Sequence, residues 1–90
     1  MTVAYLPAAG DVRVAYAIGR RVGPAVVRNR LRRRLRAAVR DLDRSRGGLA
    51  AGAYLISLRP EAAQRSYRDL HRDLDHALSA VTTPPSPDRS

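Results

Sequence analysis

The segment PAVVRNRLRRRLRAAVRDLDR, residues 24–44, predicts a long amphipathic helix around which the rest of the chain can fold. At about 100° per residue, its apolar side chains fall within one arc of about 120°, and most of its arginines lie outside that arc. Pro24 suits the first residue of the helix, because its missing N–H would find no partner there. Gly47 and Gly48 predict the end of the helix. The apolar stripe consists of Val27, Leu31, Leu35, Ala38, Val39 and Leu42.

Arginine on and before this helix supplies the whole net charge of the chain. Residues 20–46 contain eleven Arg and two Asp, which matches the net charge of +9 for all 90 residues. An Arg run is usually only a solvated helix face, but residues 12–40 contain no acid, so pairing along the helix cannot account for this one. Arg binds phosphate oxygens in pairs, and the apolar stripe lacks the bulky aromatic residues of a membrane-surface helix. The pattern therefore predicts nucleic-acid binding.

Arg28 differs from the other arginines of this helix. On the helical wheel it falls inside the border of the apolar arc, between Leu35 and Val39. Its stem is therefore predicted to pack against the sheet edge or the turn at residues 20–23. Its head then needs a fixed partner, which can be a carbonyl of that turn, an acid or the nucleic acid itself.

Short apolar segments on both sides of the helix predict three strands. Residues 2–7 are apolar and β-prone, residues 12–18 alternate strictly, and residues 53–58 form an apolar run before Arg59 and Pro60. The turn residues between the first two segments predict a β-hairpin. Tyr16 lies on the apolar face of the second strand and is predicted to belong to the core.

A second helix is predicted over residues 67–81. Ser66 and Asp69 have the spacing of a capping box, and the apolar positions that follow have helical periodicity. These positions are Tyr67, Leu70, Leu74, Ala77, Leu78 and Val81. The order β-β-α-β-α predicts an α+β fold, a small two-layer sandwich with helices packed on a sheet. Residues 1–81 are predicted to form a single nucleic-acid-binding domain, which the resemblance described below makes an RNA-binding domain, and residues 82–90, rich in Pro, Ser and Thr, a disordered tail.

The composition argues against several other kinds of site. The chain has no Cys, so disulfides and thiolate metal sites are excluded. His71 and His76 do not share a helix face, and Asp69, Asp73 and Asp75 alternate with arginines, which predicts a solvated surface rather than a metal site. No Ser/His/Asp or Cys/His set suggests a catalytic residue. No apolar run approaches the roughly 20 residues of a membrane span, and the N-terminus lacks the features of a signal peptide.

The helix and its approach resemble a known family. Residues 25–36, Ala-Val-Val-Arg-Asn-Arg-Leu-Arg-Arg-Arg-Leu-Arg, are similar to the Arg-Asn-Arg signature of the bacterial ribonuclease P protein subunit. Residues 13–23 are similar to the strand and basic turn that lead into that helix, and the later strand and helix fall where the family has them. The resemblance covers about residues 2–81. It implies a ribosomal-protein-domain-like fold with a left-handed β-α-β crossover through the signature helix, against the usual right-handed rule.

In that family the protein assists a catalytic RNA that removes the 5′ leader from precursor tRNA. The resemblance implies that the RNA holds the Mg²⁺ and does the chemistry, and that the polypeptide has no catalytic residue, metal site or bound cofactor of its own. The implied partners are ribonuclease P RNA and precursor tRNA in the cytoplasm, with no membrane and no obligate protein partner. The implied RNA-docking residues are Arg20, Arg21, Arg28, Asn29, Arg30, Arg32, Arg33 and Arg36. Tyr5 matches the tyrosine that lines the leader groove of the family.

The chain departs from the family at its start. Members begin with a basic segment and a short helix that carries two aromatic residues and forms one wall of the leader groove. Met1 falls within the strand that follows this helix, so we expect the sequence to lack the usual N-terminal helix. The alternative function is that of a non-catalytic binder of structured RNA, such as a ribosomal protein. A helix-turn-helix DNA reader is disfavoured by the three strands.

Overall fold

The computed structural model describes residues 1–82, and the order of elements agrees with the predicted β-β-α-β-α. The strands are β1 (Thr2–Pro7), β2 (Val12–Ile18) and β3 (Gly52–Leu58), the helices are α1 (Ala25–Ser45) and α2 (Tyr67–Thr82), and two short 3₁₀ turns, η1 (Arg20–Val22) and η2 (Pro60–Gln64), precede the helices. Apart from Thr82, which ends α2, the predicted disordered tail lies outside the described residues.

The predicted hairpin between the first two strands is wrong. The sheet has the order β1-β3-β2, so β3 lies between the strands that are consecutive in sequence. β1 pairs with β3 antiparallel and β2 pairs with β3 in parallel. Two strands separated by a third are roughly 10 Å apart, a distance that the four residues of the 8–11 loop can span. The most apolar strand thus takes the central position, with Gly52, Tyr54, Ile56 and Leu58 buried.

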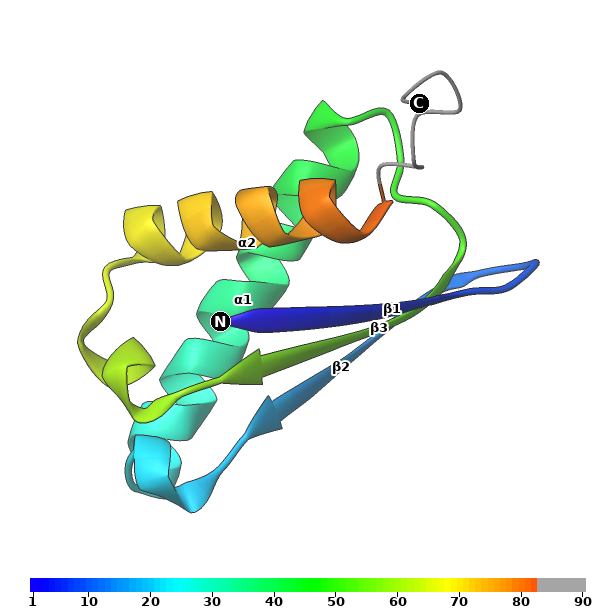
Figure 1. Ribbon diagram of the computed structural model, residues 1–90. Helices are drawn as coiled ribbons and strands as arrows, with labels where there is room; N and C mark the ends of the chain where they lie inside the picture. Colours follow the sequence, from blue (N-terminus) through cyan, green and yellow to red (C-terminus); the bar gives the residue numbers. More distant parts are fainter. Residues whose placement is uncertain (83–90) are drawn as a thin grey trace, which may run out of the picture.

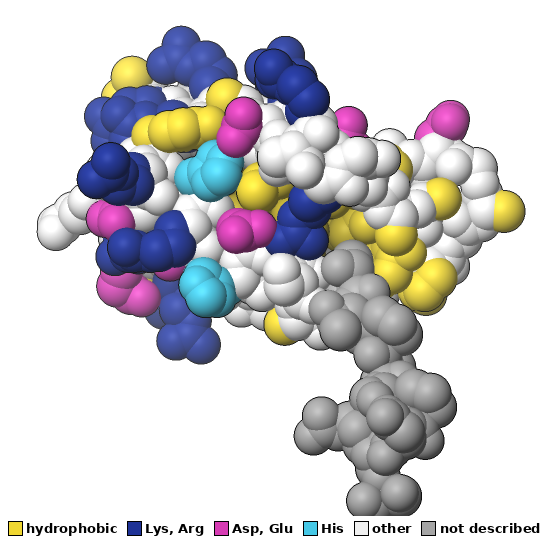
Figure 2. All heavy atoms as spheres, turned by 90° about the horizontal axis from the view of Figure 1, so that it is seen from above, with side chains coloured by type: hydrophobic (Ala, Val, Ile, Leu, Met, Phe, Trp, Pro, Cys, Tyr) yellow, Lys and Arg dark blue, Asp and Glu magenta, His cyan; other side chains and the backbone are white. Residues whose placement is uncertain are grey.

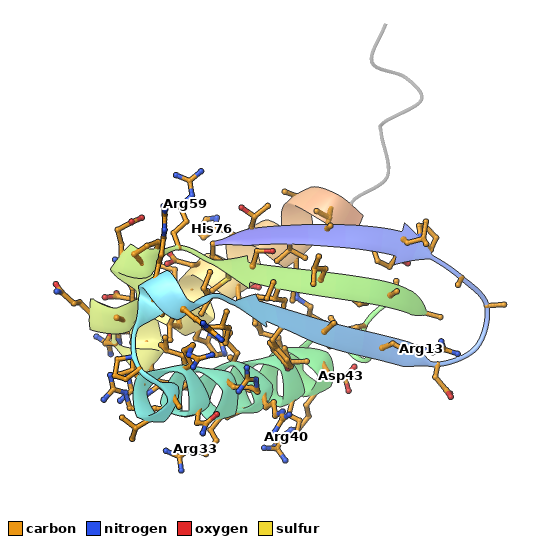
Figure 3. The ribbon with its side chains drawn as sticks, turned by 90° about the horizontal axis from the view of Figure 1, so that it is seen from below. Arg13, Arg33, Arg40, Asp43, Arg59 and His76 are labelled. Atoms are coloured by element: carbon orange, nitrogen blue, oxygen red, sulfur yellow. The ribbon has the colours of Figure 1, made fainter. Side chains whose placement is uncertain are left out.

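Both helices cover the same face of the sheet (Figures 1 and 3). α1 connects the parallel neighbours β2 and β3. Seen from the helix side with these strands pointing up, β3 lies to the left of β2 (Figures 1 and 3). The crossover is therefore left-handed, as the resemblance implies.

The core lies between the helices and the sheet. Its largest fully buried side chains are Leu31, Leu35, Ile56, Leu70, Leu74 and Leu78. The predicted stripe of α1 is confirmed at its centre, where Leu31, Leu35, Ala38 and Leu42 are buried, and Val27 and Val39 pack at its margins. Tyr67 differs from its prediction: its residue is 39% exposed, because it stands in the first turn of α2 at the rim of the core.

Predicted helix ends agree with the observed capping contacts. Gly47 adopts a φ of 73°, a left-handed conformation that costs glycine little, and the Gly48 N–H donates to the Asp43 carbonyl at 2.7 Å. At the start of α2 the Ser66 hydroxyl accepts the Asp69 N–H at 3.1 Å. Pro24 stands one residue earlier than predicted, immediately before the first residue of α1.

Candidate nucleic-acid interface

Burial of one side of α1 fixes the direction of its arginines. Because the apolar stripe is held against the sheet and α2, the opposite side of the helix faces solvent. Figure 3 shows Arg33 and Arg40 projecting from α1 away from the strands. The exposed polar residues of α1 and η1 from the predicted docking set are Arg20, Arg21, Asn29, Arg33 and Arg36, whereas Arg28, Arg30 and Arg32 are half-buried. The structure therefore brings the predicted set together along one helix and the turn before it.

The arginines from Arg20 to Arg44 are not neutralised by acids. Within residues 1–82, none of them forms an ion pair with a carboxylate. The hydrogen bonds of Arg32 and Arg34 go to neutral groups, the Asn29 side-chain oxygen at 2.9 Å and the Arg65 carbonyl at 3.4 Å. This face keeps its positive charge for an external anion.

The arginines around α2 behave in the opposite way. Arg65 pairs with Asp73 at 2.7 Å and Arg72 with Asp69 at 3.0 Å. Figure 2, which looks down on the helix side, shows basic and acidic side chains mixed over this part of the surface. The predicted solvated face of the second helix is confirmed, and the unpaired positive charge is concentrated on α1 and η1.

Arg28 has the fixed partner that the sequence predicts. Its Nε donates to the Gly23 carbonyl at 3.2 Å, and its side chain is half-buried. The turn itself is closed by two backbone hydrogen bonds, from Val22 to Gly19 and from Gly23 to Arg20, both at 3.1 Å. Arg28 thus ties the start of α1 to the turn that carries Arg20.

Replacing Arg28 by Ala should reduce stability as well as RNA affinity. The variant loses the hydrogen bond to the Gly23 carbonyl and the packing of the Arg28 side chain. This loss should lower the free energy of unfolding by about 1 kcal/mol. This cost should lower the melting temperature by roughly 4–8 °C in a domain of this size. Arg33→Ala is the matched control, because it removes the same group from an exposed position and should weaken RNA binding only. Two thermal melts and two RNA titrations at one salt concentration check this; equal melting temperatures would show that Arg28 is simply another exposed cation.

Arg30 has an unsatisfied donor. Its Nε is buried and has no hydrogen-bond partner among the described residues. Buried donors in native structures nearly always find an acceptor. Within the described residues, the Arg30 Nε is therefore an exception to that rule.

Tyr5 is engaged within the protein. Its ring stacks on Tyr54 with centroids 4.6 Å apart, and its hydroxyl donates to the Ala51 carbonyl at 2.7 Å. Gly52 makes room for this arrangement, because a Cβ at that position would lie 2.8 Å from the Tyr5 ring and 2.4 Å from the Leu6 carbonyl oxygen. The role of Tyr5 in a leader groove stays a prediction.

Tyr16 packs against the core, as predicted, but only in part, and the sequence did not indicate the arginines beside it. Its ring is half-buried beside α1, with the Arg36 guanidinium carbon 5.9 Å from the ring centroid. Burial raises the pKa of the Tyr16 phenol, and the nearby positive charges of Arg36 and Arg40 act against that shift. β2 is an edge strand, so α1 covers its apolar face only in part. Arg40, one turn after Arg36, could have been added to the docking set from its i+4 spacing alone.

Other candidate chemistry is limited in the part of the chain that the structure describes. The His71 Nε2 lies 2.6 Å from an Asp41 carboxylate oxygen, a contact that joins α2 to α1. Residues 1–82 bring together no group of three or more His, Cys, Asp or Glu side chains that could hold a metal ion. Over the same residues, neither helix is long and apolar enough to cross a membrane.

The fold and the basic face together define a class: small α+β domains with an exposed cationic helix in a left-handed β-α-β crossover. Within that class the chain belongs to the ribonuclease P protein family, whose family model, described as Ribonuclease P, matches residues 1–82. This match confirms the resemblance found in the signature helix.

Individual relatives agree with the family assignment. The chain is 44% identical over 73 residues to the ribonuclease P protein component of Thermobifida fusca, covering 80% of this chain and 48% of that protein. It is 45% identical over 73 residues to that of Salinispora tropica, covering 80% and 52%, and 40% identical over 78 residues to that of Thermus scotoductus, covering 87% and 44%. The chain thus spans about half the length of the curated relatives that it matches.

Solved structures confirm the fold. The structure of the Staphylococcus aureus RNase P protein superimposes with a TM-score of 0.69 at 18% identity, covering 89% of this chain and 72% of that one. A mutant of the same protein gives a TM-score of 0.74 at 20% identity, covering 87% and 65%.

Proposed function

We propose that this chain docks on ribonuclease P RNA through α1 and η1 and thereby assists maturation of the 5′ end of precursor tRNA. The observation that carries the proposal is the row of arginines from Arg20 to Arg44, none of which forms an ion pair within the described residues. Family membership supports the identity of the RNA. The phosphate backbone of a folded RNA is the complementary surface.

Different parts of the interface have different tasks in this proposal. The exposed Arg33 and Arg36 bind phosphates, and Arg20 and Arg21 extend the contact beyond the start of α1. Arg28 fixes the turn to the helix, so that both parts meet the RNA as one rigid surface. Phosphate contacts of this kind position a protein on RNA without reading its sequence.

The chemistry of cleavage belongs to the RNA in this account. The RNA holds the Mg²⁺ and cuts the precursor, and the protein supplies neutralising charge that lets two polyanions approach. Precursor tRNA is the second partner, with its leader near Tyr5, and the place of action is the cytoplasm. The relatives that match are each named as a ribonuclease P protein component, which supports a place for this chain in a ribonuclease P particle.

A competition experiment tests the identity of the partner. Labelled ribonuclease P RNA is bound to the protein and displaced either by the same unlabelled RNA or by a ribosomal RNA fragment of equal length. At physiological salt, we expect the ribonuclease P RNA to compete at concentrations at least about tenfold lower, because non-specific contacts are weakened by salt. Equal competition by the two RNAs would favour a general binder of structured RNA.

A further inference from the structure

A shallow hollow lies between the edge strand β2 and α1. Its volume is about 570 Å³, within the roughly 300–1,000 Å³ usual for small-ligand sites. It is lined by Tyr16, Arg33, Arg36, Val39 and Arg40. One tyrosine, one valine and three arginines therefore line the same hollow.

The Tyr16 side chain is available to a ligand in a way that two other tyrosines are not. Tyr5 and Tyr54 use their hydroxyls to hold the Ala51 and Ala50 carbonyls. No hydrogen bond to the Tyr16 hydroxyl is present within residues 1–82. The ring is only half-buried because β2 is at the edge of the sheet that residues 1–82 form.

The Arg36 guanidinium lies over the Tyr16 ring, with its carbon 5.9 Å from the ring centroid. A flat group inserted between the two would need roughly 7 Å, because stacked carbon atoms lie about 3.5 Å apart. The exposed Arg36 would therefore have to move by only about 1 Å to cover a planar ring placed on Tyr16.

We propose that this hollow binds one unpaired nucleotide of the docked RNA, with its base stacked on Tyr16 beneath Arg36 and its phosphate held by Arg33 and Arg40. An unpaired base is required, since paired bases in an RNA helix have their faces occupied by their neighbours. Stacking on an aromatic ring is tolerant of base identity. The site should therefore bind any unpaired nucleotide, whichever base it carries. Arg33 and Arg40 both line the hollow from α1, and both are exposed, so their side chains are free to turn from the positions in Figure 3 toward a phosphate at its rim.

The inference rests on the proposed docking of RNA on α1 and adds a role for Tyr16. Two RNA hairpins separate the two claims: one carries a single bulged 2-aminopurine nucleotide, and the other is fully paired. Both should bind through the arginines. Only the bulged hairpin should bind more tightly because of the hollow. Its 2-aminopurine fluorescence should fall when the base stacks on Tyr16.

Tyr16→Leu is the decisive variant, and Tyr16→Phe is its matched control. We expect Tyr16→Leu to weaken binding of the bulged hairpin by roughly 5- to 150-fold and to abolish the fluorescence change, with the paired hairpin unaffected. Tyr16→Phe should retain both properties. Arg40→Gln should instead lower the slope of log K against log salt by about 0.7–0.9, which Tyr16→Leu should not do.

Several outcomes would overturn the inference. Unchanged binding of the bulged hairpin by Tyr16→Leu would exclude stacking. An equal loss on both hairpins together with a lower melting temperature would show that Tyr16 is only a packing residue. Wild-type protein that binds ribonuclease P RNA but does not distinguish the two hairpins would remove the nucleotide site and leave the docking proposal intact. Failure to bind ribonuclease P RNA at all would instead remove the proposed function.

Discussion

Replacing Leu35 by Asp is expected to unfold the domain. Leu35 is 0% exposed at the centre of the α1 stripe. Removal of the buried leucine side chain should lower the free energy of unfolding by about 2–5 kcal/mol. The desolvation of a buried carboxylate should lower it by several kcal/mol more. A domain of this length has a total stability of only about 5–13 kcal/mol. Circular dichroism should show loss of the cooperative melt.

Val26→Asp provides the matched control for this prediction. It is the same kind of substitution on the same helix, at a residue that is 72% exposed in the first turn. An acid near a helix N-terminus interacts favourably with the helix dipole. The melting temperature of Val26→Asp should therefore equal or exceed that of the wild type. A wild-type melt for Leu35→Asp would mean that the assigned core face of α1 is wrong.

Replacing Arg32, Arg33 and Arg36 together by Ala is expected to give the largest loss of RNA affinity. Each phosphate contact adds roughly 0.7–0.9 to the slope of log K against log salt, so three substitutions should flatten the slope by roughly 2. At 0.1 M salt this corresponds to about 100-fold weaker binding. The melting temperature should stay unchanged or rise, since none of the three forms an ion pair within the described residues and their mutual repulsion is relieved.

A second triple variant, with Arg13, Arg59 and Arg68 replaced by Ala, removes the same charge from other elements. Figure 3 places Arg13 and Arg59 away from α1. Titrations of ribonuclease P RNA over a series of salt concentrations should show a slope close to that of the wild type for this control. If both triple variants flattened the slope equally, RNA binding would depend on net charge and not on the α1 face.

Local patterns predicted the elements well because each has a physical signature in neighbouring residues. Period-3.6 spacing of Leu31, Leu35 and Leu42 defined the buried side of α1, and the fixed partner of Arg28 followed from its place at the border of that arc. The cationic face could also be read from the sequence, since no acid occurs near enough to neutralise it.

Features that depend on strand order could not be predicted from these patterns. The alternation of apolar and polar residues shows which side chains of a strand share a face. It does not show which other strand pairs with that strand. The insertion of β3 between β1 and β2 follows from long-range packing, and it leaves β2 at an edge. For that reason the sequence predicts a core position for Tyr16 but not the half-exposed ring beside Arg36 that the structure shows. The left-handed crossover came from the resemblance alone.

Reconstitution with ribonuclease P RNA tests the central claim most directly. The RNA is incubated with precursor tRNA at a magnesium concentration too low for it to act alone, and release of the 5′ leader is measured. Addition of the wild-type protein should restore cleavage, and the Arg32/Arg33/Arg36 triple variant at the same concentration should not. If the folded wild-type protein failed to stimulate an RNA that cleaves normally at high magnesium, the account of this chain as the RNA-docking partner of ribonuclease P would be contradicted.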